Sequence, residues 1–561
     1  MRCYPIWTCL GSKYKYWWQP DLARASQNAM TTSKSGDALC IHSRNYQLPM
    51  AHSLTMLPLA FLLSTALTAA LLAFFAFWQR RVQKAKIASS TDSSFAPYTS
   101  LSYPILGSLQ YFSAHWEFLR TATKDGAASF HLARQQCIAV PVEKRQEFFS
   151  DSRPSFALAY AVMLGATPSM NKDFLSSMGF DITLGGRSIK FLAALLRNER
   201  INTNRFTLYR YADEWVSGLG TGALTNPFDT IYRTVFRLTV NTIAASSIAT
   251  SPIICDALVK IFHELDQSGT PATILFPWFP WWERVRRFYL MKHFHDIMTA
   301  AVDQRRKEGR NEEDPLQYLI DEGLSSLEIT QFTLAALFSG IANTGVVTAY
   351  FLCDLAAHPA YLALVRQEIL LFVSHFNPDS TLPLLTRLHS ITFDDWIRGS
   401  SHLALPITNR CLKETIRLRI ATPFHRLNDS GRDIELGGTV VPHGTILTFH
   451  SSFMHHNEEF YTEPLRWDPE RFSAERAEDM DPGRPMAFVG WGLGKHQCLG
   501  QRLAKFEIFL ITAFMVASYD FELVNIDGTP MAEMPPVELN DAVVSPPKQE
   551  VRLKLSARDC S

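Results

Sequence analysis

The chain has 561 residues, with 54 basic and 54 acidic side chains and 47% hydrophobic residues. The balanced charge offers no basic excess for binding nucleic acid, and the apolar content is sufficient for a large core. The nine cysteines include no CxxC pair, so neither a disulfide framework nor a zinc site is indicated, which fits a reducing compartment.

The first predicted element is a membrane anchor at 55–78. The segment from Thr55 to Trp78 has no charged residue and is long enough to span a bilayer. Arg80 and Arg81 follow at once, and such a cationic flank normally stays cytosolic. A buried core helix and a cleaved signal peptide are the alternatives, but the run is apolar on every face and begins late. We therefore expect a single-pass anchor with the rest of the chain in the cytosol.

The segments on either side of this anchor carry little information. Residues 1–54 show no clear pattern, and we expect either a disordered tail or an extension upstream of the true start, for which Met50 and Met56 are natural candidates. Residues 79–103 have the composition of a linker. We expect 104–561 to form one large domain.

The predicted domain is mainly α-helical, with a minor β portion. A long helix is expected from Ser325 to Leu355, where Ser325 and Glu328 have the spacing of a capping box. A second helix is expected at 359–376, and a third that ends at 417. Short strands are expected near 128–142 and 420–450.

A glycine-rich loop around Cys498 is the most informative part of the sequence. Gly492, Gly494 and Gly500 indicate tight backbone turns, and an amphipathic helix follows the loop. Because a helix N-terminus carries partial positive charge and free N–H groups, it favours a thiolate over a thiol. The loop therefore indicates a thiolate ligand, and the alternative is a buried structural cysteine.

This loop resembles the haem-binding loop of the cytochrome P450 superfamily, Phe-x-x-Gly-x-Arg/His-x-Cys-x-Gly. Gly494, His496, Cys498 and Gly500 match the pattern, and Trp491 stands where phenylalanine is usual. The resemblance implies the mainly α P450 fold, haem b as cofactor and Cys498 as the axial thiolate ligand. Thiolate ligation favours O–O bond cleavage at the iron. Trp491, Gly492 and Gly500 are expected to line the cofactor.

Two further motifs match the superfamily in the expected order. Glu414 and Arg417 form a Glu-x-x-Arg motif on one helix face, and Arg471 lies in a later Pro-Glu-Arg-Phe segment. The resemblance implies a buried cluster in which both guanidinium groups surround the Glu414 carboxylate. Its expected role is structural, since it would hold the loop that presents the cysteine.

The resemblance also implies residues that bind the haem propionates. His496 lies two residues before the cysteine, where the family uses Arg or His. Arg426 lies twelve residues after Glu414, as in the branch of the bile-acid sterol hydroxylases; the alternative is a surface residue at a strand end. The family's Trp-x-x-x-Arg motif has no clear match, and either Arg197 or Arg200 is expected to serve instead.

The predicted long helix carries the oxygen-side segment. Gly340 fits the small position, whereas Ala342 replaces the usual acid and Asn343 replaces the usual threonine, with Thr344 next. This order resembles the sterol hydroxylase and prostacyclin synthase branch. Gly340, Asn343 and Thr344 are the candidate catalytic residues; Asn343 either holds a water for proton delivery or bonds a freed backbone carbonyl.

The expected function is that of a monooxygenase anchored in the endoplasmic reticulum. It would oxidise a lipophilic substrate such as a sterol or terpenoid, using O2 and electrons from NADPH–cytochrome P450 reductase. An aromatic segment at 276–282, followed by arginines, suits a membrane interface through which such a substrate enters. The first alternative is a haem-thiolate isomerase or dehydratase that needs neither O2 nor reductase. The second is a non-catalytic haem-binding membrane protein.

Overall fold

A computed structural model describes residues 95–99, 102–103, 106–163, 186–277, 279, 281–398 and 405–558. All of them belong to one compact unit, Arg81–Ser561, while a separate unit spans Met1–Arg80. The predicted anchor at 55–78, the extension at 1–54 and most of the predicted linker lie outside the described residues.

The described strands form three small sheets. The largest has the order β1-β2-β7-β4, in which β2 and β7 are parallel and the other neighbours are antiparallel. The second is antiparallel with the order β3-β9-β8, and β5 pairs with β6. The strands are β1 (Ala128–Leu132), β2 (Gln135–Ala139), β3 (Leu224–Thr225), β4 (Pro423–Leu427), β5 (Ile434–Leu436), β6 (Thr439–Val441), β7 (Ile446–His450), β8 (Tyr519–Asn525) and β9 (Val551–Ala557).

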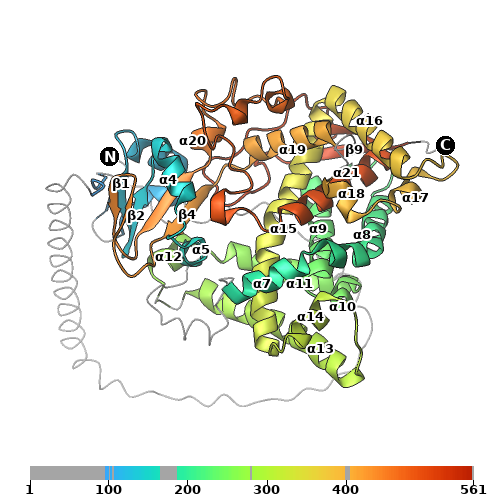
Figure 1. The fold of residues 1–561 in the computed structure, drawn as a ribbon, viewed down its shortest axis with the longest axis horizontal. Coiled ribbons are helices and arrows are strands. Elements are labelled where there is room, and N and C mark those ends of the chain that lie inside the picture. Colours follow the sequence, from blue (N-terminus) through green and yellow to red (C-terminus); the bar gives the residue numbers. More distant parts are fainter. Residues whose placement is uncertain are drawn as a thin grey trace, which may run out of the picture. The chain divides into compact units, whose positions relative to one another are not determined.

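Helices make up the larger part of the described residues (Figure 1). They are α2 (Gln110–Ser113), α3 (His115–Ala122), α4 (Arg145–Ser150), α5 (Phe156–Met163), α7 (Gly186–Leu195), α8 (Asn198–Gly218), α9 (Pro227–Ile243), α10 (Ser246–Ala249), α11 (Pro252–Gln267), α12 (Pro271–Leu275), α13 (Trp282–Glu308), α14 (Pro315–Asp321), α15 (Ser326–Ala357), α16 (Pro359–Phe376), α17 (Leu384–Leu388), α18 (Phe393–Arg398), α19 (Pro406–Arg419), α20 (Ser452–His455) and α21 (Gln501–Ser518). Short 3-10 turns are η2 (Val142–Lys144), η3 (Pro469–Phe472), η4 (Glu478–Met480) and η5 (Gly494–His496).

The long helix α15 passes through the middle of the helical region (Figure 1). It begins at the predicted capping box: the Glu328 amide donates to Ser325 Oγ (3.3 Å), and the Ser325 amide donates to Glu328 Oε2 (2.9 Å). Among the described helices it alone is long and apolar enough to cross a membrane, yet 72% of its most apolar window is buried within the protein. Packing in the core accounts for its apolar composition.

Two glycines of α15 allow close contact with α9. A Cβ atom at Gly340 would lie 3.3 Å from Thr239 Cγ2, and one at Gly345 would lie 3.1 Å from Tyr232 Cδ2. Larger side chains at these positions would push the helices apart. Gly340 therefore has a packing role against α9 that its sequence motif did not indicate.

A cluster of buried hydrophobic residues joins the β1-β2-β7-β4 sheet to α4. Phe148 and Phe149 of α4 pack against Phe449 of β7 with ring centroids 5.5 and 5.4 Å away. Strand β4, at the edge of this sheet, carries Arg426. The sheet thus presents one predicted site residue, while the others lie in helices, 3-10 turns and the loop before α21.

The fold class predicted from the sequence is confirmed as mainly α with minor β. The predicted helices at 325–355 and 359–376 correspond to α15 and α16, and α19 extends two residues beyond its predicted end, to Arg419. The strands β8 and β9 were not predicted, although β8 alternates buried and exposed residues along most of its length.

Candidate active site

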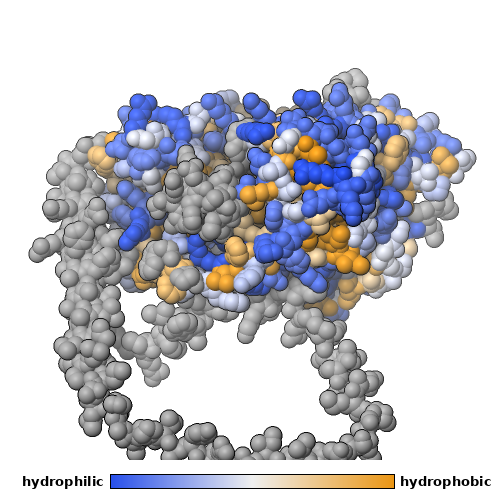
Figure 2. Space-filling view, turned by 90° about the horizontal axis from the view of Figure 1, so that it is seen from below, coloured by the Kyte–Doolittle hydropathy of each residue, from blue (hydrophilic) through white to orange (hydrophobic). Residues whose placement is uncertain are grey.

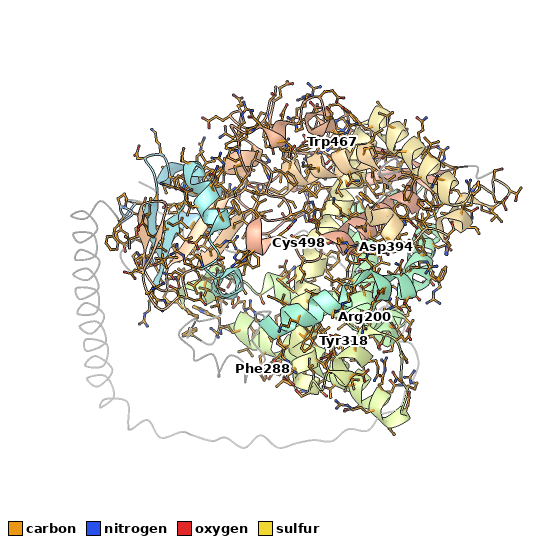
Figure 3. The ribbon with its side chains drawn as sticks, in the orientation of Figure 1. Arg200, Phe288, Tyr318, Asp394, Trp467 and Cys498 are labelled. Atoms are coloured by element: carbon orange, nitrogen blue, oxygen red, sulfur yellow. The ribbon has the colours of Figure 1, made fainter. Side chains whose placement is uncertain are left out.

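Cys498 lies in a tight loop directly before α21 (Figure 3). Its backbone N–H donates to the Trp491 carbonyl oxygen (2.7 Å), which closes the loop. Gly492 has a φ of +68°, and a Cβ atom there would lie 2.4 Å from the His496 carbonyl oxygen. Only glycine fits this position. Trp491 thus closes the loop through its carbonyl group, and Gly492 shapes it through its backbone conformation.

The Cys498 thiol is set against the N-terminus of α21. Burial raises the pKa of this thiol, whereas hydrogen bonds from the backbone amides of Gly500 and Gln501 lower it. Gly500 is the N-cap residue with a φ of −86°, and a Cβ atom there would meet no atom within 4 Å. The turn at Gly500 therefore does not itself need glycine, and the predicted close approach of its backbone to the cofactor stays a prediction. Its amide is the group that acts on the thiol and favours the ionised form.

The structure brings together Glu414, Arg417 and Arg471, and all three side chains are fully buried. Arg417 Nε and Nη2 donate to the two carboxylate oxygens of Glu414 (2.7 and 2.8 Å), and Arg471 Nε donates to Glu414 Oε1 (3.0 Å). Glu478 accepts from Arg471 Nη1 (2.9 Å) and is the second carboxylate of the cluster. Two cations and two anions thus neutralise one another within the protein interior.

This cluster is connected to the cysteine loop through His455, which sequence reasoning missed. Arg417 Nη1 donates to the His455 carbonyl oxygen, and the Val489 amide donates to His455 Nε2 (3.1 Å). Burial holds the pKa of His455 well below its ordinary value, so the ring is neutral and can accept this bond. Hydrogen bonds therefore join the Glu414 carboxylate to the start of the loop that ends at Cys498.

Arg426 and His496 form a second region around a buried arginine, and it differs from the first. Arg426 is 2% exposed, and its Nε and Nη1 atoms are buried without a hydrogen-bond partner, as is His496 Nε2. Burial lowers the pKa of Arg426 to about 10. Burial, followed by repulsion from Arg426 and Lys495, lowers the pKa of His496 to about 4. The two side chains are therefore neighbours, and their unpaired donors suit an anion. Arg426 is not the surface residue that was the alternative interpretation.

Aromatic side chains enclose this region around Arg426. The Arg426 guanidinium lies 5.3 Å from the Phe148 ring centroid and 5.9 Å from that of Phe156. The Phe156 and His496 rings lie 6.2 Å apart. Phe156 was not singled out in the sequence, because a phenylalanine in a short apolar helix gives no signal of what it covers.

The predicted oxygen-side residues lie at the centre of α15. Ser339 and Asn343, one helical turn apart, are exposed, while most of the helix around them is buried. Thr344 is 7% exposed. Ser339 Oγ donates to the Ala335 carbonyl oxygen (2.9 Å). The accessible strip on α15 is therefore formed by Ser339 and Asn343 rather than by Gly340, which packs against α9.

Arg200 is placed elsewhere. Its guanidinium stacks on the Tyr318 ring of α14 at 4.4 Å. Both residues, which are labelled in Figure 3, line a pocket of about 330 Å³ between α8, α9 and α14. The structure thus engages Arg200 in contacts that the sequence did not indicate.

The cytochrome P450 family model matches residues 223–553, more than half of the chain. That range contains the cysteine loop, the Glu414 cluster and the long helix α15. The chain belongs to the cytochrome P450 family.

Several curated proteins are similar to the chain over most of its length. The cytochrome P450 monooxygenase AacuE of Aspergillus aculeatus is 28% identical over 452 residues, which cover 78% of this chain and 88% of that protein. A cytochrome P450 monooxygenase of Pseudocercospora fijiensis is 27% identical over 486 residues, covering 82% and 96%. Obtusifoliol 14-alpha demethylase of Triticum aestivum is 25% identical over 285 residues, covering 48% and 58%. These relatives, with the family match, identify a haem-thiolate P450 monooxygenase.

The described residues fit the haem that this family binds. A thiol with two amides directed at it suits an axial thiolate, and the unpartnered donors of Arg426 and His496 suit the two carboxylates of a porphyrin. Cys498 and His496 come from the loop before α21, and Arg426 comes from β4. The fold therefore brings groups that are far apart in the sequence to one site.

Proposed function

We propose that the protein is a monooxygenase of the endoplasmic reticulum membrane that oxidises a lipophilic substrate with O2 and electrons from NADPH–cytochrome P450 reductase. The observation that supports this most directly is the Cys498 thiol beneath the amides of Gly500 and Gln501. Bound haem supplies the oxygen activation and oxidation chemistry. The chain supplies the ligand, the anion-binding groups and the substrate enclosure.

Each site residue has a proposed task. Cys498 is the axial ligand, and the backbone at Trp491, Gly492 and Gly500 shapes the loop around it. Arg426 and His496 bind the propionates through charge-assisted hydrogen bonds.

The remaining predicted residues lie on α15, at the oxygen side of the site, and in the Glu414 cluster next to the cysteine loop. Asn343, with Thr344 beside it, holds a water molecule that delivers protons on the oxygen side. The Asn343 amide can do this because it both donates and accepts hydrogen bonds. Gly340 allows α15 to approach α9 closely. The cluster of Glu414, Arg417 and Arg471 keeps the cysteine loop in position.

An exposed aromatic surface at the start of α13 supports the proposal of a membrane-associated enzyme with a lipophilic substrate. Trp282 and Tyr289 are 70% and 63% exposed, and Phe288 and Val285 lie on the same stretch of helix. Figure 2 views the protein from the side on which α13 lies in Figure 1, and apolar patches interrupt its polar surface. Exposed aromatic rings next to arginines suit the interface of a bilayer. The predicted anchor at 55–78 would hold the protein at the same membrane.

The experiment that tests this function is substrate turnover in the presence of the reductase. Microsomes that contain the full chain and the reductase are supplied with metabolite extracts from a strain lacking the gene. The proposal predicts a product that has gained an oxygen atom derived from O2, together with matching consumption of NADPH and O2. A Cys498→Ser variant is the control and should give neither.

One observation favours a second candidate, a haem-thiolate isomerase or dehydratase. Ala342 stands where most monooxygenases of this superfamily carry an acid, and Asn343 is exposed beside it. Such an enzyme would convert a substrate peroxide without NADPH or O2. Turnover in an anaerobic reaction without reductase would favour this candidate over the first.

A further inference from the structure

The first two turns of α13 carry a patch of exposed apolar side chains, which are Trp282, Val285, Phe288 and Tyr289. Each of the last three follows an earlier member by three or four residues, so the four share one side of the helix. The rings of Phe288 and Tyr289 meet edge to face, with centroids 5.9 Å apart. Phe288 is labelled in Figure 3, at the lower edge of the described helices. We call these four residues the α13 patch, and a patch of this kind indicates a partner surface.

Three arginines lie among these residues, and one of them has its own counter-ion. Arg286 forms an ion pair with Glu264 of α11 (3.0 Å), and both side chains are partly exposed. An exposed pair of this kind needs no further partner and contributes little to stability. Arg286 is therefore the reference with which the other two arginines, Arg284 and Arg287, are compared.

Arg284 has the same charge as Arg286 but no such counter-ion among the described residues. Its Nη1 atom is buried and has no hydrogen-bond partner. Burial lowers the pKa of its guanidinium group, and no described acid acts in the opposite direction. A desolvated charge without an opposite charge is unfavourable. An anion that binds at Arg284 would relieve this cost.

Arg287, one helical turn after Arg284, adds a second desolvated cation. It is 8% exposed, and its Nε donates to Ser268 Oγ (2.9 Å), which is an uncharged group. Burial, followed by repulsion from Arg284, lowers the pKa of Arg287 to about 10. Because the two guanidinium groups lie close enough to repel each other, one anion can interact with both.

An anionic phospholipid combines the two properties that this surface requires. Its phosphate accepts bidentate hydrogen bonds from guanidinium groups. Its glycerol and upper acyl region is the environment that exposed aromatic rings favour. A free phosphate ion would compensate the arginines and leave the α13 patch in water. An uncharged lipid would cover the α13 patch and leave the arginines uncompensated.

We propose that Arg284 and Arg287, together with the α13 patch, form a binding site for one anionic phospholipid whose phosphate contacts both guanidinium groups. This inference depends on the proposed membrane location, because the lipid comes from the bilayer in which the protein is held. The bound lipid fixes the start of α13 at the level of the headgroups, so the domain takes one orientation on the membrane.

The test identifies the lipids that the protein retains when it leaves a bilayer. Full-length, haem-loaded protein is reconstituted in nanodiscs with equal amounts of phosphatidylglycerol and phosphatidylcholine, and is then released for native mass spectrometry. Wild type should retain phosphatidylglycerol in preference to phosphatidylcholine. Lipids held by the predicted anchor at 55–78 are common to all variants, so the measured quantity is the change in the ratio of the two lipids.

Three single substitutions each remove one positive charge. Arg284→Gln and Arg287→Gln should each lower the ratio of phosphatidylglycerol to phosphatidylcholine about 10-fold. Arg286→Gln is the matched control, because it removes the same charge from the same helix at an arginine that is already paired, and it should leave the ratio unchanged. The variants are compared at equal haem content. Arg284 is only partly buried, so its substitution is informative even where Arg287→Gln fails to incorporate haem.

Three outcomes would overturn the inference. The first is an unchanged ratio in Arg284→Gln. The second is an equal decrease in Arg286→Gln, which would indicate attraction to the total charge of the helix. The third is loss of phosphatidylglycerol from wild type when excess inorganic phosphate is added before release, because a free ion does not replace the contacts of the α13 patch. Protein that does not enter the nanodiscs at all would instead contradict the proposed membrane location.

Discussion

Two regions of this protein contain buried arginine side chains and differ in their hydrogen bonding. Arg417 and Arg471 are fully buried, and their guanidinium groups donate hydrogen bonds to Glu414, to Glu478 and to backbone carbonyl oxygens. Arg426 is almost as deeply buried, yet two of its nitrogen atoms have no partner. Burial of an arginine alone therefore does not reveal its task.

The difference separates scaffold from ligand site. A buried pair that loses one member is left with an uncompensated charge, at a cost of about 3–5 kcal/mol. A buried donor without a partner already costs about 1–3 kcal/mol before any ligand binds. We infer that the first region stabilises the fold, whereas the second gives up stability and regains it when an anion binds.

The largest effect is expected when the paired region is broken. Arg417→Ala leaves Glu414 buried with one cation fewer and removes the bond to the His455 carbonyl. We predict that this variant incorporates no haem, as measured by haem content per purified chain. Arg466→Ala is the control, because its side chain is exposed in a surface pair with Glu463 and should change stability by less than about 1 kcal/mol. Full haem content in Arg417→Ala would refute the scaffold assignment.

A substitution of Arg426 is expected to weaken haem retention and not the fold. Arg426→Met removes a desolvated charge that has no partner atom at Nε and Nη1. The folded protein should not lose thermal stability before haem is added, whereas release of haem to excess apomyoglobin should become about 10-fold faster or more. A variant that melts earlier but holds haem as tightly as wild type would show that Arg426 belongs to the scaffold instead.

Sequence patterns predicted the paired region better than the unpaired one. The Glu-x-x-Arg and Pro-Glu-Arg-Phe motifs predicted Glu414, Arg417 and Arg471 as a cluster, and the capping-box spacing predicted the start of α15. Residues that join the cluster only through the folded structure could not be found from sequence motifs. His455 is one of them, because it bonds both Arg417 and the Val489 amide only in the folded chain.

A smaller effect, on the pH dependence of stability, is expected from Glu507, a buried acid that is not paired with a cation. Burial raises the pKa of Glu507 to about 8, although Thr239 Oγ1 donates to its carboxyl (3.1 Å). Below an ordinary value of 4.5, folded and unfolded chains are both protonated. As the pH rises from there to about 8, only the unfolded chain loses the proton, so stability falls by up to about 1.4 kcal/mol per pH unit. Above about 8 the loss is complete.

Glu507→Gln should remove this dependence. The amide keeps an acceptor for Thr239 without an ionisable proton. The melting temperature, followed by circular dichroism, should be the same for the variant and wild type near pH 4.5. As the pH approaches about 8, the variant should melt at progressively higher temperatures than wild type. Parallel melting curves across that interval would contradict the neutral carboxyl.

The central claim, that Cys498 is the thiolate ligand of haem, is tested most directly by the absorption spectrum of the reduced protein under carbon monoxide. We predict the red-shifted Soret band of sulfur ligation in wild type. Cys498→Ala should lack this band while the Glu414 cluster keeps the domain folded. A spectrum without the band in haem-loaded wild type, or the same band in the alanine variant, would contradict the account.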